Sequence, residues 1–127
     1  MEDQRAYEQD SVTNRVIWCV IQVHQTLGPG FLESIYRNAL LIELRKQGLS
    51  VVAEQRVLIY YDGHKVGRHV IDLIVEGELV VETKTVQELG RSHYAQVRSY
   101  LKATSLQRAL LINFAVDRAD FRRIEAR

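Results

Sequence analysis

Two acidic residues and one lysine could form a phosphate-cleaving site in this 127-residue chain. Glu82, Thr83 and Lys84 lie in a run of β-branched residues, and Asp72 lies upstream in a second such run. Hard cations such as Mg²⁺ prefer carboxylate and carbonyl oxygens and keep several of their waters. Asp72, Glu82 and the backbone carbonyl of Thr83 could therefore hold such an ion beside a water that attacks a phosphate.

Lys84 lies on the same side of its strand as Glu82, because side chains two residues apart share one face. A lysine is ordinarily protonated at neutral pH, so we expect Lys84 to orient the water and stabilise charge on the phosphate rather than to act as a general base. Taken alone, a Glu-x-Lys pair on a strand is more often an exposed cross-strand ion pair. These residues by themselves leave that interpretation open.

The hairpin between the two runs decides whether the acids meet, because residues opposite each other in paired strands point to the same face. A two-residue loop would send Asp72 and Glu82 to opposite faces. A three-residue loop over residues 75–77, ending on a glycine with positive φ, would place Asp72 opposite Val80 and diagonal to Glu82. We therefore predict a loop of odd length.

Length and composition predict one soluble globular domain over residues 1–127. Hydrophobic residues make up 46% of the chain and charged residues 26%, which excludes the disordered and fibrous classes. The net charge of +1 gives no global attraction to nucleic acid, so binding to phosphates would need a local basic face.

Several features predict a reducing, cytoplasmic location. Cys19 is the single cysteine, so no intrachain disulfide is available, and its apolar neighbours predict that it is packed. Residues 1–10 lack the basic start and the apolar stretch of a signal peptide. No apolar run reaches the roughly 20 residues that cross a bilayer, so we expect no membrane association.

Hydrophobic periodicity predicts the elements that position the acids. Two helices, beginning at Ser11 or Thr13 and near Phe31, are separated by the turn at residues 28–30, and Gly48 ends the second. Strand formers at residues 51–53, 57–61, 70–75 and 79–86 predict a three-stranded antiparallel meander. A helix capped by Ser92 and running to about residue 103 leads to a buried strand at 109–114, which makes the sheet mixed. The tail, residues 116–127, is expected as an edge strand or a frayed helix.

The segment Gly30-Phe31-Leu32-Glu33-Ser34-Ile35-Tyr36 resembles the signature of the GxxExxY proteins, and His24 with Leu27-Gly28-Pro29 resembles that family's lead-in. Roughly residues 12 to 124 follow its pattern. The resemblance implies the PD-(D/E)XK nuclease superfamily and its restriction-endonuclease-like α/β fold. That fold has an αβββαβ core and a mixed sheet flanked by helices, here with an additional N-terminal helix. It also implies that Asp72 and Glu82-Thr83-Lys84 are the central motif.

The same resemblance extends the candidate site to the helices. Gln96 and Tyr100 match the Gln-x-x-x-Tyr element of RecB-like members and share one helical face, with His93 a turn earlier. As isolated residues, Gln96 and Tyr100 would more often be a surface amide and a half-buried aromatic, and His93 could equally be a solvated helix residue. The implied catalytic set is Asp72, Glu82, Lys84, Gln96 and Tyr100.

Glu33 joins Asp72, Glu82 and Thr83 in the implied metal-binding set, with Tyr36 steadying it. A carboxylate in the first turn of a helix is also favoured by the helix dipole whatever its function. His24 lies on the apolar stripe of the first helix, and a core histidine is the favoured interpretation over a ligand.

The expected function is hydrolysis of nucleic acid, DNA in preference to RNA, by an Mg²⁺- or Mn²⁺-dependent nuclease that could form a homodimer. Nucleotide-binding and acyl-enzyme motifs are absent, and nothing marks base-specific contacts. The alternative is a noncatalytic nucleic-acid-binding or dimerisation module on the same scaffold. Candidate contacts to a nucleic-acid backbone, which could equally be ordinary surface charges, are Arg56, Lys65, Arg68, Arg91, Arg98 and Lys102.

Overall fold

Two helices joined by a glycine-rich turn begin the computed structural model, which describes residues 11–127. They are α2 (Ser11–Leu27) and α3 (Glu33–Lys46). Gly28 and Gly30 have φ of 66° and 115° in the turn, a region that residues with a Cβ rarely adopt. The hydroxyl of Tyr36 fastens this turn, because it donates to the carbonyl of Gly28 and accepts from the N–H of Phe31.

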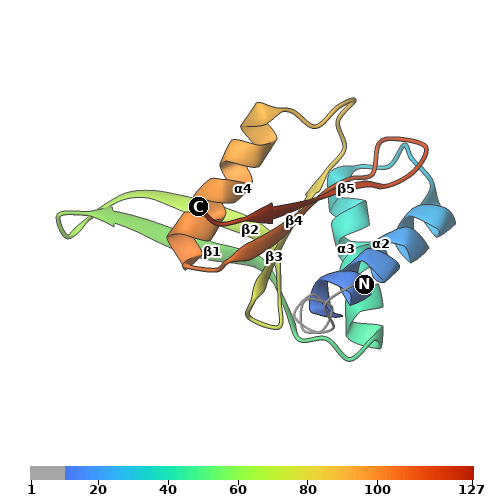
Figure 1. The fold of residues 1–127 in the computed structure, drawn as a ribbon, viewed down its shortest axis with the longest axis horizontal. Helices are drawn as coiled ribbons and strands as arrows, with labels where there is room; N and C mark the ends of the chain where they lie inside the picture. The colour runs from blue at the N-terminus through green and yellow to red at the C-terminus, as the bar shows by residue number, and fades with distance from the viewer. Residues whose placement is uncertain (1–10) are drawn as a thin grey trace, which may run out of the picture.

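A five-stranded mixed sheet follows, in the order β1-β2-β3-β4-β5 (Figure 1). β3 and β4 are parallel, whereas every other neighbouring pair is antiparallel. The helix α4 is the crossover that a parallel pair requires. The remaining elements are β1 (Val51–Tyr61), β2 (His64–Val75), β3 (Leu79–Lys84), α4 (Arg91–Thr104), β4 (Arg108–Asn113) and β5 (Asp120–Glu125).

This arrangement confirms the predicted αβββαβ order, formed by α3, β1 to β3, α4 and β4, with α2 as the additional N-terminal helix. Two local predictions are corrected. The two strands expected at 51–53 and 57–61 are one strand, β1. Gly90 rather than Ser92 precedes α4, and Ser92 lies inside that helix. Of the two structures predicted for the tail, the edge strand is confirmed, because β5 pairs with β4 at the end of the sheet.

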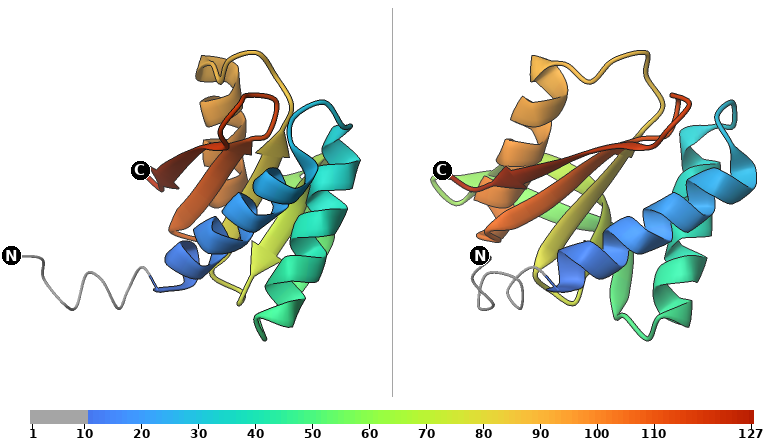
Figure 2. Two further views of the ribbon diagram at one scale, coloured as in Figure 1. Left: turned by 90° about the vertical axis from the view of Figure 1, so that its right-hand side faces the viewer. Right: turned by 45° about the vertical axis from the view of Figure 1, so that its right-hand side comes forward.

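Helices cover both faces of the sheet, α2 and α3 on one and α4 on the other (Figure 2). The larger core lies under α2 and α3, where Cys19, Tyr36 and Leu40 meet Leu73 and Val81 of the sheet. A smaller core lies under α4, where Val97 and Leu101 are packed with Val80 and Leu111. Cys19 is fully buried, as predicted.

The predicted odd-length loop between β2 and β3 is confirmed, but the predicted register is wrong by two residues. The loop comprises residues 76–78, and Val75 pairs with Leu79 and Leu73 with Val81. Val75 is fully buried, so its place is in the strand, where its side chain joins the core, rather than in the turn. Continuing this register places Asp72 opposite Glu82 rather than opposite Val80.

The segment Met1–Asp10, for which the sequence predicts no signal peptide, lies outside the described residues. Between Ser11 and Arg127, no helix combines the length and the apolar character that a membrane crossing requires.

Candidate active site

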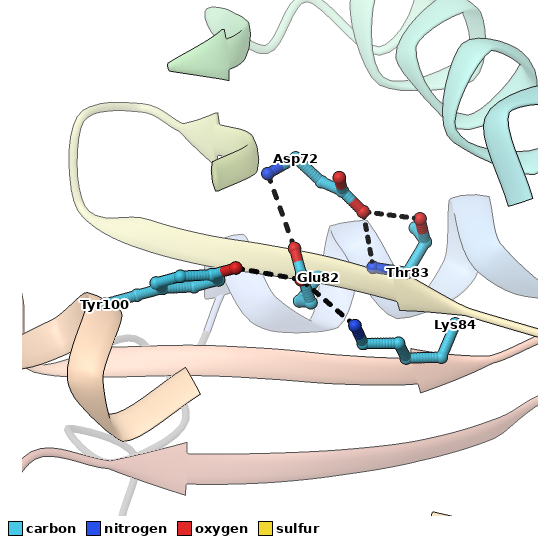
Figure 3. Close-up of polar contacts among 5 residues, drawn as sticks. All are labelled: Asp72, Glu82, Thr83, Lys84 and Tyr100. Carbon is cyan, nitrogen blue, oxygen red and sulfur yellow. Dashed lines mark hydrogen bonds and ion pairs between the residues drawn. The ribbon is translucent and has the colours of Figure 1, made fainter. Parts of the chain in front are cut away.

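The two acids lie where β2 and β3 separate. Backbone pairing between these strands ends at Leu73 and Val81, and side-chain oxygens accept the hydrogen bonds at the next position. Asp72 N–H donates to Oε1 of Glu82 at 3.4 Å. In return, Oδ2 of Asp72 accepts from the N–H of Thr83 at 2.9 Å and from its hydroxyl at 2.6 Å (Figure 3). The opening of the sheet therefore makes room for both carboxylates.

At Asp72, the side chains of β2 also change from packing in one core to packing in the other. Leu73 belongs to the core under α2 and α3, whereas Ile71 belongs to the core under α4. Regular alternation would give both residues to the same face. Opposite this point on β1, Glu54 has a φ of 52°, an irregular conformation for a strand residue. Asp72 thus lies where the strand passes from one layer to the other.

Glu82 is at the centre of the remaining polar contacts. Its Oε2 lies 3.6 Å from Nζ of Lys84 and accepts a hydrogen bond from the hydroxyl of Tyr100 at 3.4 Å (Figure 3). The side chain of Lys84 is 17% exposed and that of Glu82 is 5% exposed. The ion pair is therefore largely buried, unlike the exposed pair that a Glu-x-Lys sequence more often indicates.

Burial and neighbouring negative charge both raise the pKa values of the acids in this site. Burial, followed by the charge of Asp72, raises the pKa of Glu82 to about 8, although Lys84 opposes this shift. The same two causes raise the pKa of Glu33. Burial, followed by the carboxylate of Glu82, raises the pKa of Tyr100, so its hydroxyl remains a proton donor. Burial and the charge of Asp72 together therefore outweigh the attraction of Lys84 and favour the protonated form of Glu82.

The helices bring only part of the predicted set to the sheet. Glu33, the first residue of α3, is half-buried and close enough for its pKa to respond to the charges of Asp72 and Lys84. Tyr36 fastens the preceding turn rather than steadying Glu33. The hydroxyl of Tyr100 donates to Glu82, so this residue of the crossover helix does face the sheet.

Gln96 and His93 lie apart from these contacts. Gln96 is exposed, and within residues 11–127 no hydrogen bond joins it to Glu82 or Lys84. The imidazole Nδ1 of His93 accepts from the N–H of Gly90 at 2.8 Å, so this histidine fixes the start of α4. His24 behaves as a core histidine, 7% exposed, with Nε2 2.7 Å from the carbonyl oxygen of Val116.

Two supporting residues escaped the sequence analysis. The ring of His69 packs edge-on against Tyr100 at 4.8 Å, and its Nε2 lies 2.8 Å from Oγ of Ser99. The buried amide of Asn113 exchanges hydrogen bonds with both backbone groups of Val86, just beyond Lys84. A polar residue at the end of an apolar strand is a signal that could have revealed Asn113, whereas no spacing pattern singles out His69.

The donor set suits a hard cation held by few protein ligands. Asp72 and Glu82 supply carboxylate oxygens, and their repulsion is of the kind that a divalent cation relieves. Across the described residues, no three His, Cys, Asp or Glu side chains lie close enough together to surround a metal ion. A site of two carboxylates, with waters and a substrate phosphate in the other positions, matches the usual binding mode of Mg²⁺.

A family model of the PD-(D/E)XK nuclease superfamily matches residues 10–124. The chain belongs to this superfamily. Within the matched range, Asp72 and Glu82-Thr83-Lys84 have the residue types that the name of the superfamily gives, although Ile71 rather than proline precedes Asp72. The fold is the restriction-endonuclease-like α/β fold that the sequence predicts, with an N-terminal helix added.

A solved structure, titled "Crystal structure of SSO0001", has a similar fold, with a TM-score of 0.62 and 19% sequence identity. The match covers 96% of this chain and 61% of the other chain, so this chain spans less than two thirds of that protein. A search of curated proteins gave no match.

Proposed function

We propose that this protein is a metal-dependent phosphodiesterase of the GxxExxY group that hydrolyses nucleic acid, with DNA as the favoured substrate over RNA. The observation that carries the proposal is the contact set of Glu82, a buried carboxylate beside Asp72 that meets Lys84 and Tyr100. Membership of the PD-(D/E)XK nuclease superfamily supports the same chemistry.

In the proposed site, Asp72, Glu82 and the carbonyl of Thr83 would hold Mg²⁺ or Mn²⁺, with Glu33 as a further contact to the ion or its water. The bound ion would supply an activated water and offset the negative charge of the phosphate. Lys84 would donate a hydrogen bond toward the attacking water or the phosphate and stabilise the charge that develops there.

Other residues orient the two carboxylates through hydrogen bonds. Thr83 fixes one carboxylate oxygen of Asp72 through two hydrogen bonds, and Tyr100 donates to Glu82. Gln96 would act from the protein surface, as a substrate contact rather than as a partner of Lys84.

Cleavage assays with purified protein test the proposal. Single-stranded and duplex DNA and RNA would be incubated with Mg²⁺ or Mn²⁺, and Lys84→Ala should lower kcat/KM at least about 100-fold. Lys46→Ala is a matched control, because it breaks an exposed Lys–Glu ion pair on α3, whose atoms are 3.1 Å apart. Cleavage that survives Lys84→Ala would come from another protein in the sample and would refute the assignment.

The second candidate is a noncatalytic nucleic-acid-binding module. It is favoured by the hydrogen bonds that occupy Oδ2 of Asp72 and by the lack, within residues 11–127, of a third close ligand. Calorimetric titration with Mn²⁺ separates the two candidates. An active site should bind the ion and lose that binding in Asp72→Asn, whereas a binding module should hold nucleic acid equally well in both forms.

The proposal also includes a reducing, cytoplasmic setting, which the single buried Cys19 supports. A homodimer is compatible with exposed apolar side chains on and before α3, such as Leu32 and Ile42, which are 72% and 61% exposed. Sedimentation equilibrium would measure whether two copies associate.

A further inference from the structure

A basic cavity lies on the side of α4 that faces away from the carboxylates of Asp72 and Glu82. A cavity of about 550 Å³ opens between this helix and the end of the chain, which lies beside α4 in Figure 1. Three of its six lining residues are cations, and none is acidic. The lining consists of Ala95, Arg98, Ser99, Lys102, Ala126 and Arg127.

The charges of this cavity are unbalanced. Within residues 11–127, no ion pair joins Arg98, Lys102 or Arg127 to a carboxylate side chain. Cationic side chains that converge without a carboxylate side chain repel one another, and a bound anion lowers that cost. The arrangement therefore favours a negatively charged ligand.

Arg98 provides a second and independent observation. Its Nε is the one buried side-chain nitrogen or oxygen among the described residues that has no hydrogen-bond partner. A buried donor without an acceptor costs free energy, so a shift of this guanidinium toward an oxyanion in the cavity would be favourable. Arginine suits this role because its planar group can bind two oxygens of one phosphate together.

The same helix connects this cavity to the candidate active site. Tyr100 faces the sheet and donates to Glu82, whereas Arg98 and Lys102 lie on the other side of α4. Ser99 lines the cavity and is hydrogen-bonded to His69, whose ring packs on Tyr100. A polyanion that passes the active site could therefore also contact α4.

We infer that Arg98, Lys102 and Ser99 form a binding site for a backbone phosphate of the nucleic-acid substrate, distant from the phosphate that is cleaved. This inference rests on the proposed function for the identity of its ligand. Free inorganic phosphate offers the same oxygens, so the experiment separates the two sources.

Binding is measured in EDTA, where cleavage cannot obscure it. The probes are inorganic phosphate, followed through the NMR signal of the Arg98 Nε–H, and a fluorescent oligothymidylate about 12 nucleotides long, followed by anisotropy. Both probes should shift that signal. Arg98→Gln with Lys102→Gln should weaken oligonucleotide binding by about tenfold or more, which is the effect of losing a charge-assisted hydrogen bond.

The salt dependence supplies a second measurement. The slope of log K against log salt should fall by about 0.7 for each phosphate contact that is lost. Arg45→Gln with Lys46→Gln is the matched control, because it removes two exposed cations from the last turn of α3 and leaves α4 unchanged. Arg98→Lys keeps the charge but loses the Nε donor, and should show an intermediate affinity if the protein remains folded by circular dichroism.

Three results would overturn the inference. They are an Arg98 signal that responds to neither probe, equal losses in the α4 and α3 variants, and phosphate binding with unchanged oligonucleotide binding in the α4 variant. The last would show a site for small anions only. Because these measurements need no metal and no cleavage, they give an answer whether or not the nuclease assay succeeds.

Discussion

Thr83 donates two hydrogen bonds to a single carboxylate oxygen of Asp72, one from its backbone N–H at 2.9 Å and one from its hydroxyl at 2.6 Å. Thr83 is fully buried, so water cannot replace either bond. The middle residue of the Glu-Thr-Lys segment therefore orients the acid on the neighbouring strand, although its own side chain lies outside the contacts of Glu82.

Replacing Thr83 should show how much its hydroxyl contributes to the free energy of unfolding. Thr83→Val keeps the branched shape and the N–H but removes one bond to Asp72, so the free energy of unfolding should fall by about 1 kcal/mol in urea titrations. Any nuclease activity should fall as well. Thr85→Val is the control, because Thr85 is half-buried and makes no side-chain hydrogen bond within the described residues. Equal losses in both variants would mean that the bond to Asp72 has no special effect.

Tyr100→Phe removes the hydroxyl that donates to Glu82 and keeps the ring in its packed position. Because the bond is long, at 3.4 Å, we expect kcat to fall a few-fold with little change in KM, as for a positioning residue. Steady-state kinetics would measure both constants. Tyr94→Phe removes a hydroxyl from the same helix without touching Glu82, and should leave kcat unchanged. A change in KM alone would assign Tyr100 to substrate binding instead.

The loop of residues 76–78 sets the register of the two acids, and Gly77 has a φ of 65° within it. Gly77→Ala should lower the free energy of unfolding by about 1 kcal/mol, since the left-handed region disfavours a Cβ. A Cβ at this position meets no atom within 4 Å, so the cost comes from the backbone alone. Gly67→Ala, also free of contacts but without a positive φ, should be neutral or slightly stabilising. Thermal unfolding of both variants would test this contrast.

Cys19 should be chemically inert in the folded protein. Burial, followed by the charge of Glu43, raises the pKa of its thiol from 9.0 to about 11, so the reactive thiolate is scarce at neutral pH. Iodoacetamide should label it only after unfolding in urea, as mass spectrometry would detect. Rapid labelling of the native protein at pH 8 would contradict the burial of this residue.

The raised pKa of the Cys19 thiol also predicts that the folded protein loses stability at alkaline pH. The folded state holds the thiol proton more tightly than the unfolded state, so the contribution of Cys19 is complete below pH 9 and declines as the pH rises through 11. The total decline should be on the order of 2 kcal/mol. Comparison with Cys19→Ala isolates the thiol from other groups that titrate there. A constant difference between the two proteins from pH 8 to 11 would exclude the shift.

Local sequence signals predicted the helices well, because glycines and apolar periodicity act within a few residues. Gly28 and Gly30 end the first helix as expected, and Gly48, with a φ of 77°, follows the second. The prediction of Ser92 as the cap was wrong because α4 begins directly after Gly90, where the imidazole of His93 accepts from the N–H of Gly90 as the N3 residue of a capping box does. Capping by His93 depends on the rotamer that its packing allows, which no sequence pattern reveals.

Within the candidate site, the sequence predicted that the loop between β2 and β3 has an odd number of residues, but not which residues form the loop. Strand alternation required an odd-length hairpin loop if Asp72 and Glu82 were to meet, and the loop has three residues. Its position depended on Val75, which lies in the core rather than in the turn. Gln96 and Tyr100 share a helical face by spacing, yet α4 crosses the sheet so that only Tyr100 contacts Glu82.

The sequence by itself determined which residue types are available and the order of helices and strands, because both follow from side-chain chemistry and short-range periodicity. Tertiary structure alone decided that β2 and β3 separate at Asp72 and that three cations around α4 converge without an acid. These relationships join residues distant in sequence, and their geometry follows from how the two cores pack on either face of the twisted sheet.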